Sequence, residues 1–324
     1  MFPQDKIIIF FFIIPTITVL ISPAVQLLMP EKNKIPEDIL NNIFKLIIGR
    51  RAELKLMIRA IEKELPIIIE GPVGTGKTEM AKALASSLDR LFVRVDGDDS
   101  LTSIKLKGWY DPPLVLEKGF LRETFIPGPL TQAMEEGGIF FYNEVNRAPS
   151  ETINAVLTAL DENLITIPQL GEIHAKPGFL SIFTYNPQDT VATNPLPMAF
   201  YDRCIWIHVT HQKLEEMIEI VKLRTNCDDE LLNKISCEIV QATLNHPELE
   251  IGSTVRGAIQ LVELYKSEES IEEESLLNKV IAVHSRKIRC KTTSKKTELE
   301  ILEEIVSKIL SNYEDNRIIR KKEY

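Results

Sequence analysis

The stretch "PIIIEGPVGTGKTEM", residues 66–80, constrains the fold more than any other part of this chain of 324 residues. Residues 71–78 fit the pattern G-x-x-x-x-G-K-[ST], in which the glycines allow backbone N–H groups to wrap around a phosphate chain. In such a loop Lys77 can reach the β- and γ-phosphates of a nucleotide, and the hydroxyl of Thr78 can face Mg²⁺. The predicted nucleotide-binding residues are Gly71, Pro72, Val73, Gly74, Thr75, Gly76, Lys77 and Thr78.

The segments around this loop predict the rest of the fold. An apolar run at 66–70 predicts a buried strand before the loop, and a helix is expected from Lys77 to about residue 88. Four more apolar runs predict strands at 91–95, 138–143, 179–186 and 204–209. Helical patterns separate them at 130–136, 150–161 and 197–201, after a first helix from about residue 39. Strands alternating with helices predict an α/β fold, a parallel sheet with helices on both faces.

Two stretches interrupt this alternation. Residues 114–125 have two short apolar runs around Lys118 and Gly119, and residues 164–175 have a turn near Gly171, so both are expected to be β-hairpins. From His211 onward no strand pattern is evident, and apolar residues recur at helical spacing. We therefore predict three parts: an apolar N-terminal segment at 1–35, an α/β domain at 36–210, and a small all-helical lid domain at 211–324.

The predicted strand at 138–143 ends in Asn143 and Glu144. In enzymes with a phosphate-binding loop, a second strand ends beside the loop; its first acidic residue holds Mg²⁺ through water, and its second polarises the attacking water. Asn143 can still accept a hydrogen bond from a metal-bound water, but it lacks the negative charge, so weaker Mg²⁺ binding is expected. Glu144 keeps the position of the base. The predicted metal-site residues are Thr78 and Asn143.

Three further polar residues follow predicted strands or open a helix. Asn186 ends the fourth strand and is expected between the first and third strands, near the γ-phosphate, unless it is only a turn residue before Pro187. Arg203 precedes the fifth strand; it could reach the nucleotide of a neighbouring subunit as an arginine finger, or form a salt bridge with Asp202 or another acid. Arg256 opens a helix that Ser253 or Thr254 could cap, and it could touch the γ-phosphate.

The N-terminus carries 23 uncharged residues, 7–29, long enough for a helix of roughly 35 Å to cross a bilayer. Lysines follow this stretch, so a transmembrane anchor would leave the C-terminal bulk in the cytoplasm. A misassigned start is the alternative, because Met29 begins a stretch suited to a soluble protein. A cleaved signal peptide is disfavoured, because the leading segment has no net positive charge.

Charge and composition exclude other classes of function. The formal net charge of −9 argues against nucleic acid as the main partner, and the basic stretches at 286–296 and 317–322 are read as solvated helix ends and a tail. None of the four cysteines forms a C-x-x-C pair, which indicates free thiols in a reducing compartment. The five histidines have no metal-ligand spacing, so we expect no structural metal.

Together these motifs resemble the MoxR-type branch of the AAA+ ATPases from about residue 36 to the end. The resemblance rests on "EGPVGTGKT", "GPLTQAMEEGGIFFYNEVNRAPSETINAVLTALDE", "TYNPQD", "DR" and "GSTVRGA". It implies that Asn143 and Glu144 form the Mg²⁺-and-water motif, that Asn186 and Arg256 are the two sensors, and that Arg203 is the arginine finger. The family has Asp where this chain has Asn143, which puts the hydrolysis rate in doubt. It also implies that the segments at 114–125 and before 179 are the family's two inserts.

The resemblance further implies ATP and Mg²⁺ as cofactors and a six-membered ring that remodels other proteins, often with a von Willebrand A-domain partner. The N-T-x-D signature of GTP-using AAA+ translocases is missing after the fourth strand, which favours ATP. Two hypotheses remain: an ATP-hydrolysing, chaperone-like remodeller, and a nucleotide-gated scaffold with weak or no hydrolysis because of Asn143.

Overall fold

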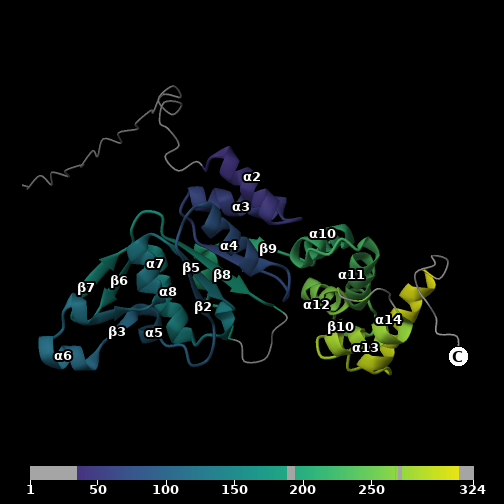
Figure 1. The fold of residues 1–324 in the computed structure, drawn as a ribbon. Coiled ribbons are helices and arrows are strands. Elements are labelled where there is room, and N and C mark those ends of the chain that lie inside the picture. The colour runs from purple at the N-terminus through teal and green to yellow at the C-terminus, as the bar shows by residue number, and fades with distance from the viewer. Residues whose placement is uncertain (1–34, 188–193, 267, 269–271, 314–324) are drawn as a thin grey trace, which may run out of the picture. The chain divides into compact units, whose positions relative to one another are not determined.

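The computed structural model describes residues 35–187, 194–266, 268 and 272–313, which belong to one compact unit beginning at Ile35. Its centre is a five-stranded sheet in the order β2-β5-β8-β1-β9, and every neighbouring pair is parallel (Figure 1). The strands are β1 (Ile67–Glu70), β2 (Phe92–Asp96), β5 (Ile139–Asn143), β8 (Leu180–Tyr185) and β9 (Ile205–His208). The prediction of an α/β fold with a parallel sheet is confirmed.

Helices cover both faces of the sheet. Successive strand residues point to opposite faces, so apolar strands present side chains that must be buried on each face. Ile67 and Ile69 pack in the core beneath α2 (Glu37–Leu46), α3 (Arg51–Glu62) and α4 (Lys77–Ser87). Ile68 packs in the core on the other face, with α7 (Pro129–Glu136) and α8 (Ser150–Glu162). Strands buried on both faces explain why the sequence shows continuous apolar runs rather than alternation.

Phe141 tests the importance of this packing. Its side chain is fully buried on the α2–α4 face of the sheet and stacks on Phe92, with ring centroids 5.2 Å apart. Phe141→Ala is expected to lower the free energy of unfolding by about 3–5 kcal/mol. Leu116→Ala, at a side chain 90% exposed, is the control and should change it by about 0.5 kcal/mol or less. Equal effects in urea unfolding would contradict the placement of the core.

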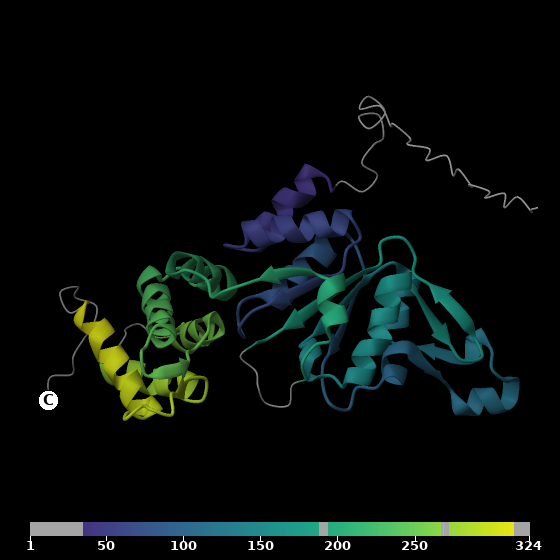
Figure 2. The same ribbon diagram turned by 180° about the vertical axis from the view of Figure 1, so that it is seen from behind.

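The first predicted hairpin, at 114–125, is wrong in detail. The strands that pair are β3 (Gly108–Tyr110) and β4 (Phe125–Pro127), and the segment between them contains α6 (Pro112–Lys118) and the 3₁₀ helix η1 (Arg122–Thr124). Asp111 caps α6 by accepting a hydrogen bond from the Leu114 N–H at 3.2 Å, and Pro112 opens it. Figures 1 and 2 show α6 at the end of this insertion, beyond β3.

The second predicted hairpin is confirmed. It pairs β6 (Leu164–Ile167) with β7 (Gly171–His174) in antiparallel register. The connections of the α/β part also contain α5 (Ser103–Lys107), the 3₁₀ helix η2 (Val145–Arg147) and α9 (Met198–Arg203).

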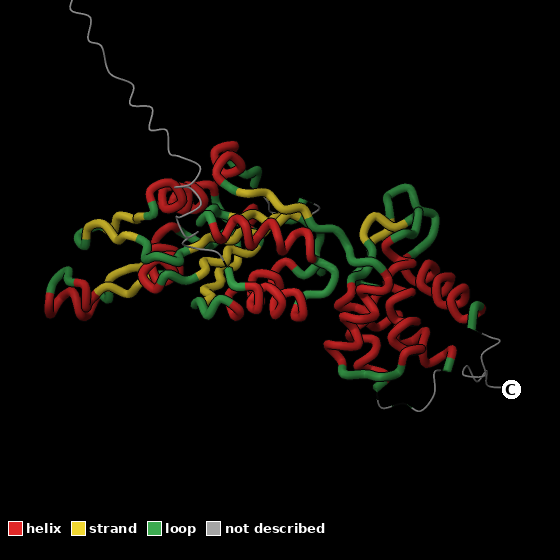
Figure 3. The backbone as a smooth tube through the Cα atoms, turned by 90° about the horizontal axis from the view of Figure 1, so that it is seen from above, coloured by secondary structure: helices red, strands yellow, loops and turns green. Residues whose placement is uncertain are grey.

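The C-terminal part is mainly helical, but the prediction that it has no strands is wrong. Its helices are α10 (Leu214–Thr225), α11 (Glu230–Leu244), α12 (Val255–Tyr265), α13 (Glu273–His284) and α14 (Glu298–Ser311). Between them, β10 (Leu249–Ile251) pairs antiparallel with β11 (Arg289–Cys290). Figure 3 shows strand colour among the helices of this part. Strands of three and two residues are too short to leave a period-2 pattern in a sequence.

No helix among the described residues combines the length and the apolar character needed to span a bilayer. The expected anchor at 7–29 and the basic tail at 317–322 lie outside the residues that the structure describes.

Candidate functional site

The phosphate-binding loop joins β1 to α4 at the carboxyl edge of the sheet, where ligands bind in open parallel folds. Gly74 and Gly76 have φ values of +79° and +88°, a region that favours glycine. A Cβ atom on Gly74 would lie 2.5 Å from the Cβ of Thr254, so a larger residue here would also collide with the helical part. Because α4 starts directly after Gly76 without a side-chain cap, its first N–H groups are available to an anion.

Lys77 points its ammonium group back into the loop. Its Nζ donates hydrogen bonds to the carbonyl oxygens of Gly71, at 2.6 Å, and Pro72, at 2.7 Å. Burial lowers the pKa of Lys77 to about 8, against the opposing effect of the Glu144 carboxylate. A partly desolvated cation with neutral carbonyl partners gains from a phosphate group, which would replace those partners with a charge-assisted pair.

Glu144 leaves the end of β5 in a left-handed backbone conformation, with φ 52° and ψ 52°. This conformation is uncommon for a residue with a side chain, and such residues concentrate at functional sites. The backbone N–H of Glu144 donates to Thr184 Oγ1 at 2.8 Å, and its carboxylate pairs with Arg147 Nε at 3.1 Å. Thr184 therefore holds the backbone of Glu144, and Arg147 holds the carboxylate that is predicted to act on water.

Asn143 sits in a chain of hydrogen bonds across three neighbouring strands. Its Oδ1 accepts from Thr184 Oγ1 on β8 at 2.9 Å, and its Nδ2 donates to Asp96 Oδ1 on β2 at 2.8 Å. These two bonds fix which way the amide faces. The oxygen keeps a second lone pair, which leaves it able to accept from a metal-bound water as the sequence predicted.

The phosphate-binding loop, Asn143 and Glu144 line one cavity of about 610 Å³, called here the P-loop cavity. From the sequence-predicted site it brings together residues 73–78, Asn143, Glu144 and Arg256. One part of the wall is apolar and comes from the α2–α3 connection and from the helical part: Ile47, Ile48, Ile220, Leu223, Val255 and Ile259. A cavity with an apolar wall and a cationic, hydrogen-bonding loop suits a ligand that joins a flat base to phosphates.

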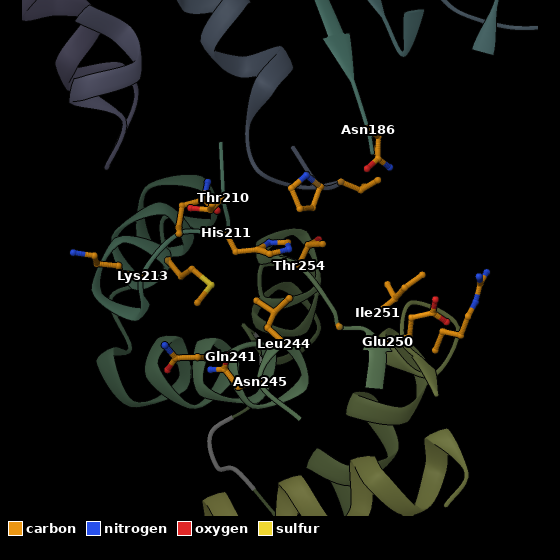
Figure 4. A pocket seen from close by; sticks show the side chains of 16 residues that line it. Asn186, Thr210, His211, Lys213, Gln241, Leu244, Asn245, Glu250, Ile251 and Thr254 are labelled. Carbon is orange, nitrogen blue, oxygen red and sulfur yellow. The ribbon is translucent and has the colours of Figure 1, made fainter. Parts of the chain in front are cut away.

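Asn186 lies elsewhere. It follows β8, which is between β5 and β1 as predicted, but its side chain lines a second cavity of about 630 Å³. Figure 4 shows Asn186 at the end of its strand, facing a space that Leu244 and Thr254 also border. Pro72 and Val73 of the loop border this cavity too. Asn186 therefore lies next to the loop, but in a different cavity from Lys77.

Arg203 does not line either cavity. Its Nη2 donates to Asp161 Oδ2 at 2.7 Å, its Nε also contacts this carboxylate, and its Nη1 donates to the Ala199 carbonyl at 2.7 Å. The alternative of a salt bridge with another acid is thus realised by Asp161. The expected cap of α12 differs too: Thr254 holds the cap position without a side-chain hydrogen bond, and Ser253 Oγ contacts buried His284 Nδ1 at 2.7 Å.

Comparison with known proteins shows what this chain is similar to. Residues 66–204 match the AAA domain of the dynein-related subfamily. The gas vesicle ATPase GvpN2 of Halobacterium salinarum is 24% identical over 274 residues, with 79% of this chain and 77% of the relative covered. The gas vesicle ATPase GvpN of Haloferax mediterranei is 25% identical over 248 residues, covering 72% and 71%. These matches support the resemblance to the MoxR-like AAA+ ATPases that the sequence motifs indicated.

A solved structure agrees with this assignment at the level of fold. A protein from Cytophaga hutchinsonii matches 86% of this chain, and 94% of its own length, with a TM-score of 0.50 at 22% identity.

The residues that line the P-loop cavity fit a nucleotide-bound Mg²⁺ ion. Thr78, Asn143 and Glu144, which carry side-chain oxygen atoms, all line the P-loop cavity. Among the described residues no group of three or more His, Cys, Asp or Glu side chains could hold a metal alone. Mg²⁺ commonly takes few protein ligands and fills its shell with water and phosphate oxygens, so this sparse oxygen set suits Mg²⁺ delivered with ATP.

The structure adds residues that the sequence motifs did not identify. Arg94, on β2, lines the P-loop cavity. Buried Arg50 donates to the carbonyl oxygen of Thr75 at 3.2 Å and also contacts the Thr210 carbonyl, and Gln212 Nε2 donates to the same Thr75 oxygen at 3.2 Å. These bonds tie the loop to the segment that leads into the helical part. The one signal that the sequence offered for this role is that Arg50 directly precedes α3.

Proposed function

We propose that this AAA+ chain binds ATP with Mg²⁺ in the P-loop cavity and hydrolyses it. The observation that supports this best is that Lys77 and Glu144, a phosphate-binding cation and a fixed carboxylate, line the same cavity. Lys77 would turn from the loop carbonyls to the β- and γ-phosphates. The two relatives named above are ATPases by their names, which favours hydrolysis over binding alone.

In the proposed reaction Glu144 accepts the proton of a water that attacks the γ-phosphate. Thr78 and Asn143 orient the metal's shell, and the bound Mg²⁺ supplies neutralisation of the charge that develops on the phosphates. Arg256, in the first turn of α12, lines the same cavity and would pair with the phosphates. Asn186 would act from the second cavity, next to Pro72 and Val73, and would report on the loop rather than share the cavity with Lys77.

The test of this function is phosphate release by the purified full chain with ATP, with and without Mg²⁺. Mg²⁺-dependent release supports the enzyme. Tight Mg²⁺-dependent binding without release would favour the second candidate, a nucleotide-gated scaffold. That candidate is favoured by Asn143, whose oxygen is already shared with Thr184 and carries no charge.

We further propose that the active form is a ring, in keeping with the family, and that it remodels other proteins. A hexamer and a von Willebrand A-domain partner follow from the resemblance, and a cytoplasmic location follows from the lysines after the apolar N-terminal stretch; all three stay predictions. Arg203 is compatible with the ring, because in the described subunit it lies outside both cavities, where it pairs with Asp161 rather than facing the nucleotide site of its own subunit.

Arg203→Ala gives a test of this arrangement. Mixing an excess of Arg203→Ala subunits with parent protein should depress ATPase activity more than dilution does, because each finger would complete its neighbour's site. Asp161→Asn is the matched control: it removes the partner of Arg203 but keeps the guanidinium. A strictly proportional loss with Arg203→Ala, or an equal loss with Asp161→Asn, would indicate that the ion pair is structural.

A further inference from the structure

The carboxylate missing from position 143 has a counterpart on the neighbouring strand. Asp96 ends β2, and its Cα is the direct partner of Asn143 in the parallel pairing of β2 with β5. Gly97 N–H donates to the Asn143 carbonyl at 2.8 Å, so the two strand ends are joined by backbone as well as side chain. The amide of Asn143 therefore has a carboxylate at hydrogen-bond distance at the same edge of the sheet.

We propose that Asp96 is a positioning residue for the metal of bound nucleotide: it supplies the negative charge that Asn143 lacks and holds the Asn143 amide with its oxygen turned away from β2. The proposal rests on the proposed ATP site. It differs from the sequence-based view that Asn143 simply weakens the site, because it places the missing charge one strand away.

Two observations support a charged, orienting Asp96. Asp96 Oδ1 accepts hydrogen bonds from Arg94 Nη2 at 2.6 Å and from Asn143 Nδ2 at 2.8 Å, and such bonds favour a carboxylate. Asn143 is held at both ends, with its Nδ2 on Asp96 and its Oδ1 on Thr184; loss of the acceptor on β2 would remove the reason for the amide to keep this orientation.

Arg94 competes for the negative charge of Asp96. Its guanidinium binds Asp96 at 2.6–3.1 Å and partly neutralises it, and the pair is exposed enough to be a surface ion pair of little consequence. Arg94 lines the P-loop cavity, however, whereas Asp96 does not border it and acts on the site through Arg94 and Asn143. Removing the carboxylate would leave Arg94 as an unpaired cation there. Both effects, a lost anion and a freed cation, would act against Mg²⁺ in the same direction.

The experiment measures the Mg²⁺ concentration for half-maximal binding of a fluorescent ATP analogue to the full chain. Asp96→Asn is expected to raise this concentration about tenfold, the lower end of effects seen for residues that orient metal ligands. Asp96→Glu, which keeps the charge, should stay closer to the parent. Asp99→Asn is the control, an exposed acid three residues further on that loses the same charge.

Exchanging the carboxylate and the amide between positions 96 and 143 gives a sharper comparison. Asn143→Asp alone would set two carboxylates against each other where a 2.8 Å hydrogen bond now lies, so it should not improve Mg²⁺ binding as the sequence alone suggested. Combined with Asp96→Asn, the donor and acceptor are exchanged, and the Mg²⁺ requirement should return toward that of the parent.

Thermal unfolding without nucleotide shows that each variant is folded. The proposal is overturned if Asp96→Asn shifts the Mg²⁺ requirement no more than Asp99→Asn, or if the double variant is no better than Asp96→Asn alone. In either case a parent that binds the analogue leaves the proposed function standing. A parent that does not bind the analogue with Mg²⁺ overturns both.

Discussion

Glu144→Gln is expected to lower ATP hydrolysis by about 10²-fold or more while leaving ATP binding intact. The substitution removes the group that would accept the proton of the attacking water but keeps the shape of the side chain. The backbone bond from Glu144 N–H to Thr184 does not depend on the side chain, so the strand end should keep its position. Phosphate release and binding of a labelled ATP analogue, measured on one preparation, separate the two effects.

Glu151→Gln is the control for this prediction. Glu151 is an exposed acid in the first turn of α8, outside both cavities, and its loss should leave hydrolysis unchanged. If Glu144→Gln releases phosphate as fast as the parent, another group activates the water. If the parent protein itself does not release phosphate, the nucleotide-gated scaffold becomes the better supported of the two candidate functions.

Lys77→Ala is expected to weaken ATP binding by about 10²-fold or more. Hydrogen bonds to charged groups contribute about 1.5–3 kcal/mol each, and Lys77 would make such bonds to two phosphates. The variant also loses two bonds to loop carbonyls, so thermal unfolding should be measured beside binding. Lys63→Ala, at an exposed cation just after α3, should bind like the parent. Unchanged affinity in Lys77→Ala would mean that the nucleotide binds elsewhere.

The sequence was informative about the sheet because each of its strands is a short apolar run bounded by turn residues. It was less informative where structure depends on a few residues. The sequence analysis expected one helix from about residue 39, whereas the structure has two, α2 and α3, separated by a break at Gly49, where φ is +75°. The apolar residues 114–116 resembled a strand, but a capping Asp111 and two prolines start a helix there.

The candidate site divides in the same way. Lys77, Thr78, Asn143 and Glu144 belong to local motifs, and the structure brings them to one cavity. The roles of Asp96 and Thr184 depend on the order of strands, because β2, β5 and β8 are neighbours in the sheet but far apart in the chain. No local pattern reveals such a pairing. Asn186 shows the converse, since a motif position does not specify which cavity a side chain borders.

The most direct test of the nucleotide site is a crystal structure of the full chain with Mg²⁺ and a non-hydrolysable ATP analogue. The account predicts phosphates against Lys77 and the first turn of α4, and the base against the apolar wall that includes Ile47 and Ile48. Lys77 Nζ should have left the carbonyl oxygens of Gly71 and Pro72. Analogue bound only in the cavity that Asn186 lines, with Lys77 still held by its own loop, would contradict the account.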